Sequence, residues 1–220
     1  MKIAIGDSFT YGEELQDRHT QAWPALIGYE NYGLRGASNE YIFRKSVELA
    51  STSSHMIIAW SECTRYDFYT NIPVSVANRY KNYTGPVQVN PGWATAKNPW
   101  NEHAMPFFRD LYVKFTDEKY HFIKTLSYMT ALQDVLYANQ VEYYYCSSFS
   151  NNEMFEKYAN DDEVKLWIDR LNTKMFIGYP KQGFVEWAYG TPHGPDGHPL
   201  EQGHKRIAEE ILNHALHSGR

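Results

Sequence analysis

The sequence predicts a three-layer α/β/α fold around a parallel sheet of about five strands. Three short apolar runs, Lys2–Ile5, His55–Trp60 and Val141–Cys146, have the length and continuous hydrophobicity of strands buried on both faces. Longer segments in which apolar residues recur at helical spacing alternate with them, at Tyr120–Asn139 and Leu200–Leu216. Such alternation is typical of a parallel sheet with helices on both sides.

Weaker signals complete the expected order of elements. Ser38 or Asn39 is a suitable N-cap for a helix that runs to Ala50. The other expected elements are a helical turn at Trp23–Ile27, a short strand at Glu30–Tyr32, a helix at Asp162–Phe176 and a strand at Phe184–Tyr189.

In a long stretch between Tyr66 and Asp117, the apolar residues recur at neither helical nor strand spacing. It is rich in Pro, Asn, Gly and aromatic residues, among them Tyr66, Tyr69, Tyr80, Tyr83, Trp93 and Trp100. A loop of this length in a compact domain is usually functional or an insertion. We expect one domain spanning residues 1–220, with this aromatic-rich insertion at about 66–117, leaving the sheet at the edge where ligands bind.

Composition restricts the class of protein. The chain has 220 residues, 43% of them hydrophobic, which suffices for a packed core. The net charge is −5 and no run of Lys or Arg occurs, so neither nucleic acid nor an anionic membrane surface is an expected partner. No secretory signal, no membrane span and no disulfide framework (only Cys63 and Cys146) is visible, which favours a cytoplasmic location.

Gly6-Asp7-Ser8, directly after the first expected strand, is a candidate nucleophile motif. A serine hydroxyl needs a base to remove its proton and backbone N–H groups to hold the developing oxyanion. The turn after a parallel strand offers such donors, and Gly6 permits a sharp turn. Alternatively, Ser8 only caps a helix.

Asp196-Gly197-His198-Pro199, before the last expected helix, is the matching candidate for the base. Pro199 suits the first helical position and favours an extended conformation for His198. The positive field of the helix N-terminus would then keep the imidazole neutral. Asp196 is close enough in sequence to orient the ring. Alternatively, His198 is an ordinary structural histidine.

The order of these motifs resembles the GDSL, or SGNH, hydrolase family, whose fold is of the flavodoxin-like type. Residues 6–12 (GDSFTYG) resemble its first block and residues 31–39 (NYGLRGASN) its second. The resemblance implies an esterase that needs no cofactor or metal, with Ser8 as nucleophile and His198 as base. It also implies oxyanion donation by the N–H groups of Ser8 and Gly36.

Two positions depart from the family pattern. The third block normally supplies an Asn side chain as oxyanion donor after a buried strand, but this chain reads Trp60 to Arg65 there (WSECTR). Ser61, Thr64 or Arg65 then takes the place of that donor, or Asn39 reaches across. The family acid lies three residues before the base, whereas Asp196 lies two before His198.

The substrate expectation is a short acyl group on a carbohydrate, since the insertion is polar and aromatic; lipid and thioester substrates come next. Asp7, Asn39, Trp60 and Arg65 are candidate substrate-binding residues. Arg65 either pairs with an anionic group of the substrate or forms an ion pair with Asp67 or Glu62. The WSECTR segment also resembles a subset of the family found in bacteriophages.

Two rival interpretations remain open. His193, Asp196, His198 and His204 fall within a dozen residues, a spacing at which side chains of these types bind zinc. A non-catalytic binding or structural protein, built on the same fold with a degraded oxyanion site, is the second. Dinucleotide binding is excluded because no Gly-x-Gly-x-x-Gly follows the first strand.

Overall fold

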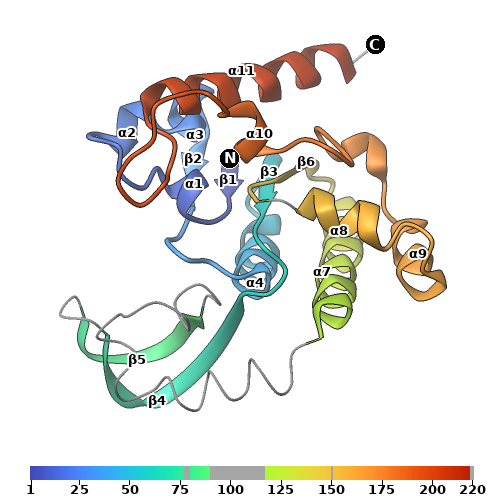
Figure 1. The fold of residues 1–220 in the computed structure, drawn as a ribbon, viewed down its shortest axis with the longest axis horizontal. Coiled ribbons are helices and arrows are strands. Elements are labelled where there is room, and N and C mark those ends of the chain that lie inside the picture. Colours follow the sequence, from blue (N-terminus) through green and yellow to red (C-terminus); the bar gives the residue numbers. More distant parts are fainter. Residues whose placement is uncertain (77–79, 90–116, 150, 219–220) are drawn as a thin grey trace.

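The computed structural model describes residues 1–76, 80–89, 117–149 and 151–218 of the chain. Its main sheet has four parallel strands in the order β2-β1-β3-β6 (Figure 1). The strands are β1 (Lys2–Ile5), β2 (Glu30–Asn31), β3 (His55–Trp60) and β6 (Glu142–Ser147). The predicted α/β/α class is therefore confirmed.

Helices cover both faces of this sheet. Figure 1 shows α4 (Asn39–Ala50) and α7 (Glu118–Ala138) on one face and α3 (Trp23–Leu26), α10 (Phe184–Trp187) and α11 (Glu201–Ser218) on the other. Shorter helical segments are α1 (Ser8–Tyr11), α2 (Arg18–Gln21), α8 (Asn151–Lys157), α9 (Asp162–Ile168) and the 3₁₀ turn η2 (Thr173–Met175).

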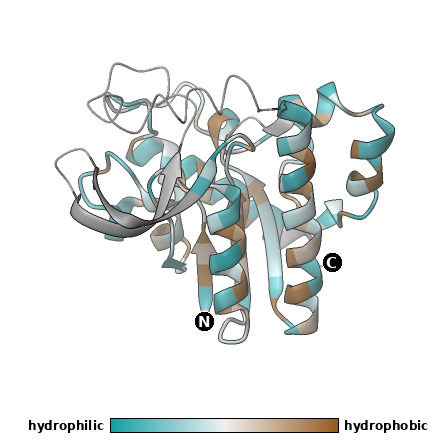
Figure 2. Ribbon diagram, turned by 90° about the horizontal axis from the view of Figure 1, so that it is seen from below, coloured by the Kyte–Doolittle hydropathy of each residue, from teal (hydrophilic) through white to brown (hydrophobic). Residues whose placement is uncertain are grey.

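Side chains of each strand alternate between two apolar cores, as the pleat requires. In β3, Met56, Ile58 and Trp60 belong to the core beneath α4 and α7. Ile57 and Ala59 belong to the core beneath α3 and α11. Hydrophobic and hydrophilic residues alternate along the helices in Figure 2, as expected of helices with one buried face.

Among the described residues, the sheet continues beyond β6 only as a single residue pair, in a segment where no strand was predicted. Phe176 forms an isolated parallel bridge with Tyr145 of β6, and the Ile177 N–H donates to the Tyr145 carbonyl over 2.8 Å. The predicted helix at Asp162–Phe176 is accordingly shorter than expected. Its helical part, α9, ends at Ile168; Leu171 is then buried, and Phe176 joins the sheet edge.

The strand predicted at Phe184–Tyr189 is wrong, because this segment forms the helix α10. Phe184 and Trp187 are three residues apart, and their ring centroids lie 5.7 Å from each other on the buried side of that helix. Phe184 also packs against Trp23 at 5.4 Å. Packing of these aromatic side chains against the core therefore outweighed the β propensity of the segment.

The predicted insertion begins with an antiparallel hairpin, β4 (Tyr66–Val76) and β5 (Tyr80–Val89), which projects from the α/β body in Figure 1. Trp93 and Trp100 lie outside the described residues. Among the described helices, none has the length and hydrophobicity that a membrane crossing requires.

Candidate active site

The candidate site lies where the strand order of the sheet reverses. From β1 the chain proceeds to β2 on one side, and later to β3 and β6 on the other. Loops at the carboxyl ends of β1 and β3 diverge at such a point and leave a crevice that ligands occupy. Ser8 follows β1 directly, and the segment Ser61 to Arg65 follows β3 directly.

Ser8 is the first residue of α1, and its placement is tightly constrained. Asp7 caps this helix, since its Oδ1 accepts the Phe9 N–H over 3.1 Å. A Cβ on Gly6 would meet Thr10 Oγ1 at 2.2 Å, so only glycine fits there. Ser8 is 6% exposed and its hydroxyl makes no hydrogen bond to another described residue. Its neighbours therefore leave the hydroxyl available for chemistry.

The loop between β2 and α4 runs beside Ser8. The Leu34 N–H donates to the Gly6 carbonyl over 3.0 Å, and Asn31 Nδ2 donates to the Thr10 carbonyl over 2.8 Å. Gly36 has a φ of 69°, a left-handed conformation that glycine adopts without strain. Within the described chain, the N–H groups of Ser8 and Gly36 have no hydrogen-bond acceptor. Both expected backbone donors are thus available to a ligand.

His198 is held by Glu14, a residue that the sequence analysis did not single out. Glu14 Oε2 lies 3.1 Å from His198 Nδ1 and accepts the His198 backbone N–H over 3.1 Å. Glu14 has a φ of 65°, an uncommon conformation for a residue with a long side chain. A Cβ on Gly194 would meet the Glu14 carboxyl carbon at 2.5 Å, so the carboxylate approaches only because position 194 is glycine.

Asp196, the predicted acid, does not contact the imidazole. Its side chain is exposed, and its backbone N–H donates to Glu14 Oε1 over 2.9 Å. The two-residue spacing from His198 turns the Asp196 carboxylate outward, around Gly197 with a φ of 84°. The structure thus assigns the position beside Nδ1 to Glu14 instead.

The environment of Glu14 fixes the tautomer of His198. Burial raises the pKa of Glu14, but hydrogen bonds from the N–H groups of Asp196 and His198, and from the His198 ring, outweigh it and leave the pKa lowered. A carboxylate ion can only accept, so Nδ1 must carry the proton. Nε2 of the neutral ring then has a free lone pair, as a general base requires.

We expect Glu14 to stabilise the fold in a pH-dependent way. The pKa of Glu14 in the folded state is below its ordinary value of 4.5. Its contribution to the free energy of unfolding is therefore full above pH 4.5, and it is lost as the pH falls through the folded-state pKa. Urea unfolding should show Glu14→Gln about 1–3 kcal/mol less stable than the parent protein at pH 7. That difference should shrink on acidification. A difference that is constant from pH 7 to pH 3 would contradict this prediction.

The loop of His198 also packs on the loop of Ser8. The ring centroids of His198 and Phe9, the residue after Ser8, lie 5.7 Å apart. In the described part of the chain, no hydrogen bond joins Ser8 Oγ to His198 Nε2. Such contacts are often long without substrate and tighten when it binds. The contact of His198 with Phe9 and with Glu14 therefore brings the loop of His198 against the segment that begins at Ser8.

The histidines of the zinc alternative have separate environments. His204 is fully buried, its Nδ1 accepts the Trp23 N–H over 3.2 Å, and burial lowers its pKa to about 4. His193 Nδ1 lies 2.7 Å from the Thr191 carbonyl. Among the described residues, no three potential metal ligands gather. Pro199 pairs with His193 in an isolated bridge, and α11 begins later, at Glu201, so the prediction that Pro199 opens the helix is wrong.

Three of the predicted substrate-binding residues lie inside the fold. Asp7 is fully buried and accepts a hydrogen bond from Ser61 Oγ over 2.7 Å. Asn39 is buried against Ser61, donating to its carbonyl and accepting its N–H over 2.9 and 2.8 Å. Trp60 is fully buried and packs edge-on against Tyr145. The three side chains therefore make structural contacts inside the fold and are not exposed to a substrate.

Arg65 pairs with neither of the two carboxylates expected from the sequence. Its Nη1 lies 3.5 Å from Asp7 Oδ2, while Asp67 binds Arg44 over 2.6 Å. The expected pairs joined neighbours along the chain. The observed pair joins the loop after β3 to the loop after β1.

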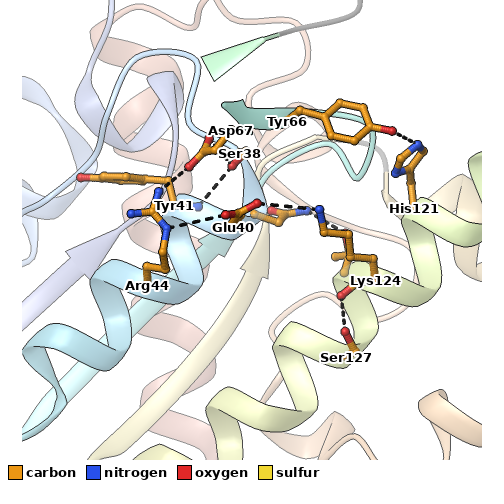
Figure 3. Close-up of polar contacts among 11 residues, drawn as sticks. Ser38, Glu40, Tyr41, Arg44, Tyr66, Asp67, His121, Lys124 and Ser127 are labelled. Atoms are coloured by element: carbon orange, nitrogen blue, oxygen red, sulfur yellow. Dashed lines mark hydrogen bonds and ion pairs between the residues drawn. The ribbon is translucent and has the colours of Figure 1, made fainter. Parts of the chain in front are cut away.

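The first residues of β4 are anchored to α4 and α7 (Figure 3). Asp67 accepts from Ser38 Oγ over 2.5 Å as well as from Arg44, and Tyr66 is hydrogen-bonded to His121 on α7. Lys124 lies 5.5 Å from the centre of the Tyr66 ring. These contacts hold the chain immediately after Arg65, and through Ser38 the end of the loop that carries Gly36.

Comparison with known proteins supports the architecture. No family model matches the chain, and no curated protein matches it. Among solved structures, the crystal structure of TesA is similar over 99% of this chain and 98% of that chain, with a TM-score of 0.52 and 12% sequence identity. At this identity the likeness concerns the fold, and it extends over the whole α/β/α arrangement.

Proposed function

We propose that the protein is a serine esterase of the GDSL/SGNH superfamily. The contact that carries this proposal is the one between Glu14 and His198, which leaves a basic nitrogen on the loop packed against the Ser8 loop. The position of Ser8 at the strand-order reversal and the fold likeness to TesA support the same conclusion. A hydroxyl, a base and an orienting carboxylate are the parts that acyl transfer needs.

In the first half of the reaction, His198 Nε2 takes the proton of Ser8 Oγ as the oxygen attacks the ester carbonyl carbon. The carbonyl oxygen becomes an anion, held by the N–H groups of Ser8 and Gly36. When the intermediate collapses, the bond to the leaving alkoxide breaks and the imidazolium returns its proton to that oxygen. Glu14 stabilises the imidazolium between these two proton transfers.

In the second half, water replaces the alcohol. His198 removes a proton from the water, whose oxygen attacks the acyl carbon on Ser8. When the tetrahedral intermediate that results collapses, the bond between the acyl carbon and Ser8 Oγ breaks, the imidazolium returns its proton to Oγ, and the carboxylic acid is released. No redox step and no further reactant is required.

We propose a short acyl group on a carbohydrate as the substrate, with lipid and thioester substrates as the next candidates. The aromatic and polar composition of the stretch from Tyr66 to Asp117 supports a sugar, because sugar rings stack on aromatic side chains. A panel of acetylated oligosaccharides, p-nitrophenyl esters of increasing chain length and acyl thioesters would rank these classes by kcat/KM.

The function is tested by a fluorophosphonate probe together with p-nitrophenyl acetate. We expect covalent labelling that peptide mapping assigns to Ser8, and turnover that labelling abolishes. Absence of both labelling and turnover would reject the esterase and favour the alternative, a non-catalytic binding protein on this fold.

Separate substitution of Glu14 and Asp196 shows which of the two carboxylates orients His198. Glu14→Gln offers an amide that can donate to Nδ1 and stabilise the wrong tautomer, so kcat should fall about 10²–10⁴-fold. Asp196→Asn is the matched control and should stay within about twofold of the parent, since its contribution is a backbone N–H. The reverse ranking of the two variants would return the acid role to Asp196.

A further inference from the structure

Arg65 has a buried guanidinium between the two loops that carry the candidate oxyanion donors. Its side chain is 4% exposed, and Nη1 lies 3.5 Å from Asp7 Oδ2 and 3.3 Å from the Ala37 carbonyl. Asp7 directly precedes Ser8, and Ala37 directly follows Gly36. The guanidinium therefore contacts the immediate sequence neighbour of each of the two residues, Ser8 and Gly36, whose backbone N–H groups hold the oxyanion in the proposed mechanism.

The other side chains expected to replace the family Asn already donate their protons within the fold. Ser61 Oγ donates to Asp7 over 2.7 Å, and Thr64 Oγ1 donates to Glu62 over 2.7 Å. A hydroxyl has one proton to donate. Asn39 Nδ2 donates to the Ser61 carbonyl and to Thr125 over 2.9 and 3.1 Å. Ser61, Thr64 and Asn39 are therefore occupied by these contacts.

Arg65 retains donor capacity. A guanidinium has five N–H groups, and the buried Nε–H of Arg65 has no hydrogen-bond partner among the described residues. Buried donors are nearly always paired, so this N–H is a donor that an acceptor on a bound ligand would satisfy. The guanidinium also lies 4.6 Å from the centre of the Phe149 ring, which packs edge-on against Phe9 at 4.8 Å. Its position is thus fixed on several sides.

We propose that Arg65 is the third donor of the oxyanion site, in place of the neutral amide of the family that the sequence resembles. This inference rests on the esterase function proposed above. The guanidinium donates a charged hydrogen bond to the oxygen of the tetrahedral intermediate. Charged hydrogen bonds are about twice as strong as neutral ones. The carbonyl oxygen of the bound substrate is neutral and becomes negative only in the transition state, so the interaction acts on kcat more than on KM.

The test compares Arg65→Ala and Arg65→Gln with the parent protein, using p-nitrophenyl acetate turnover and the rate of fluorophosphonate labelling. For Arg65→Ala we expect kcat to fall about 10²–10³-fold with KM changed less than about threefold. Arg65→Gln keeps an amide N–H and should lose less. Millimolar guanidinium should raise the turnover of Arg65→Ala, while the same concentration of NaCl should not.

Arg206→Ala is the control, because this arginine also donates to a backbone carbonyl, that of Tyr189 over 2.9 Å, but is exposed on α11 and has no part in the proposed mechanism. It should retain parent kcat and KM. Parent-like kcat in folded Arg65→Ala, or a loss confined to KM or to the melting temperature, would overturn the proposal. If Arg65→Ala does not fold, because Asp7 is left unpaired, a parent-like kcat in Arg65→Gln overturns it equally.

The same assays separate the two proposals. If the parent protein neither turns over the ester nor labels at Ser8, the esterase function fails and the role of Arg65 fails with it. If the parent protein is active and the Arg65 variants match it, only the role of Arg65 is rejected.

Discussion

Replacement of Ser8 by alanine is expected to remove covalent labelling completely and to lower kcat for ester hydrolysis by about 10⁴–10⁶-fold. The variant loses the atom to which the acyl group is attached, while the oxyanion donors and Glu14 remain. Any residual rate should come from the polarised site alone. The fold should persist, since the Ser8 side chain makes no hydrogen bond to the described residues around it.

Ser46→Ala is the matched control for this experiment. Ser46 is also buried, but it lies on α4 and donates to the Ile42 carbonyl over 2.7 Å within its own helix. Labelling and kcat should be unchanged in this variant. Undiminished labelling of Ser8→Ala would show that the nucleophile lies elsewhere in the chain.

Replacement of His198 by alanine should have an effect of similar size. Without a base the Ser8 hydroxyl stays protonated, so we expect kcat to fall about 10⁴–10⁶-fold while the substrate still binds. The ring also occupies the space between Phe9 and Glu14. Imidazole added to the solution should therefore restore part of the turnover by entering that space.

His193→Ala distinguishes a base from a metal ligand. His193 lies on the same loop, with Nδ1 2.7 Å from the Thr191 carbonyl, and has no part in the proposed mechanism. It should keep kcat within about threefold of the parent. Equal losses in His193→Ala and His198→Ala, together with loss of turnover in the presence of EDTA, would instead support the zinc hydrolase.

The sequence predicts the elements of this fold best where burial is continuous. The runs at β1, β3 and β6 are apolar because helices cover both faces, and a strand of that kind needs no tertiary information to be recognised. The segment at Phe184 was misassigned because its aromatic residues suit a strand equally well. Only contact with Trp23 and α11 decides in favour of the helix, and that contact lies outside any local window.

In the candidate site, too, the local motifs could be predicted from the sequence and the contacts set by tertiary structure could not. The loops of Ser8 and His198 were predicted to meet, and the ring contact between Phe9 and His198 brings them together. The carboxylate was missed, because its approach depends on the left-handed backbone at Glu14 and on the absence of a side chain at Gly194. Neither feature has a residue pattern of its own; the only available signal was an acidic residue soon after the turn at Gly12.

The origin of the orienting carboxylate affects how related sequences should be searched for. In the proposed triad the carboxylate comes from the turn that follows α1, so the linear order of the three groups is serine, glutamate, histidine. A motif scan that demands an aspartate just upstream of the terminal histidine would discard such proteins as inactive. A scan that also accepts an acidic residue in the turn shortly after the serine would recover them.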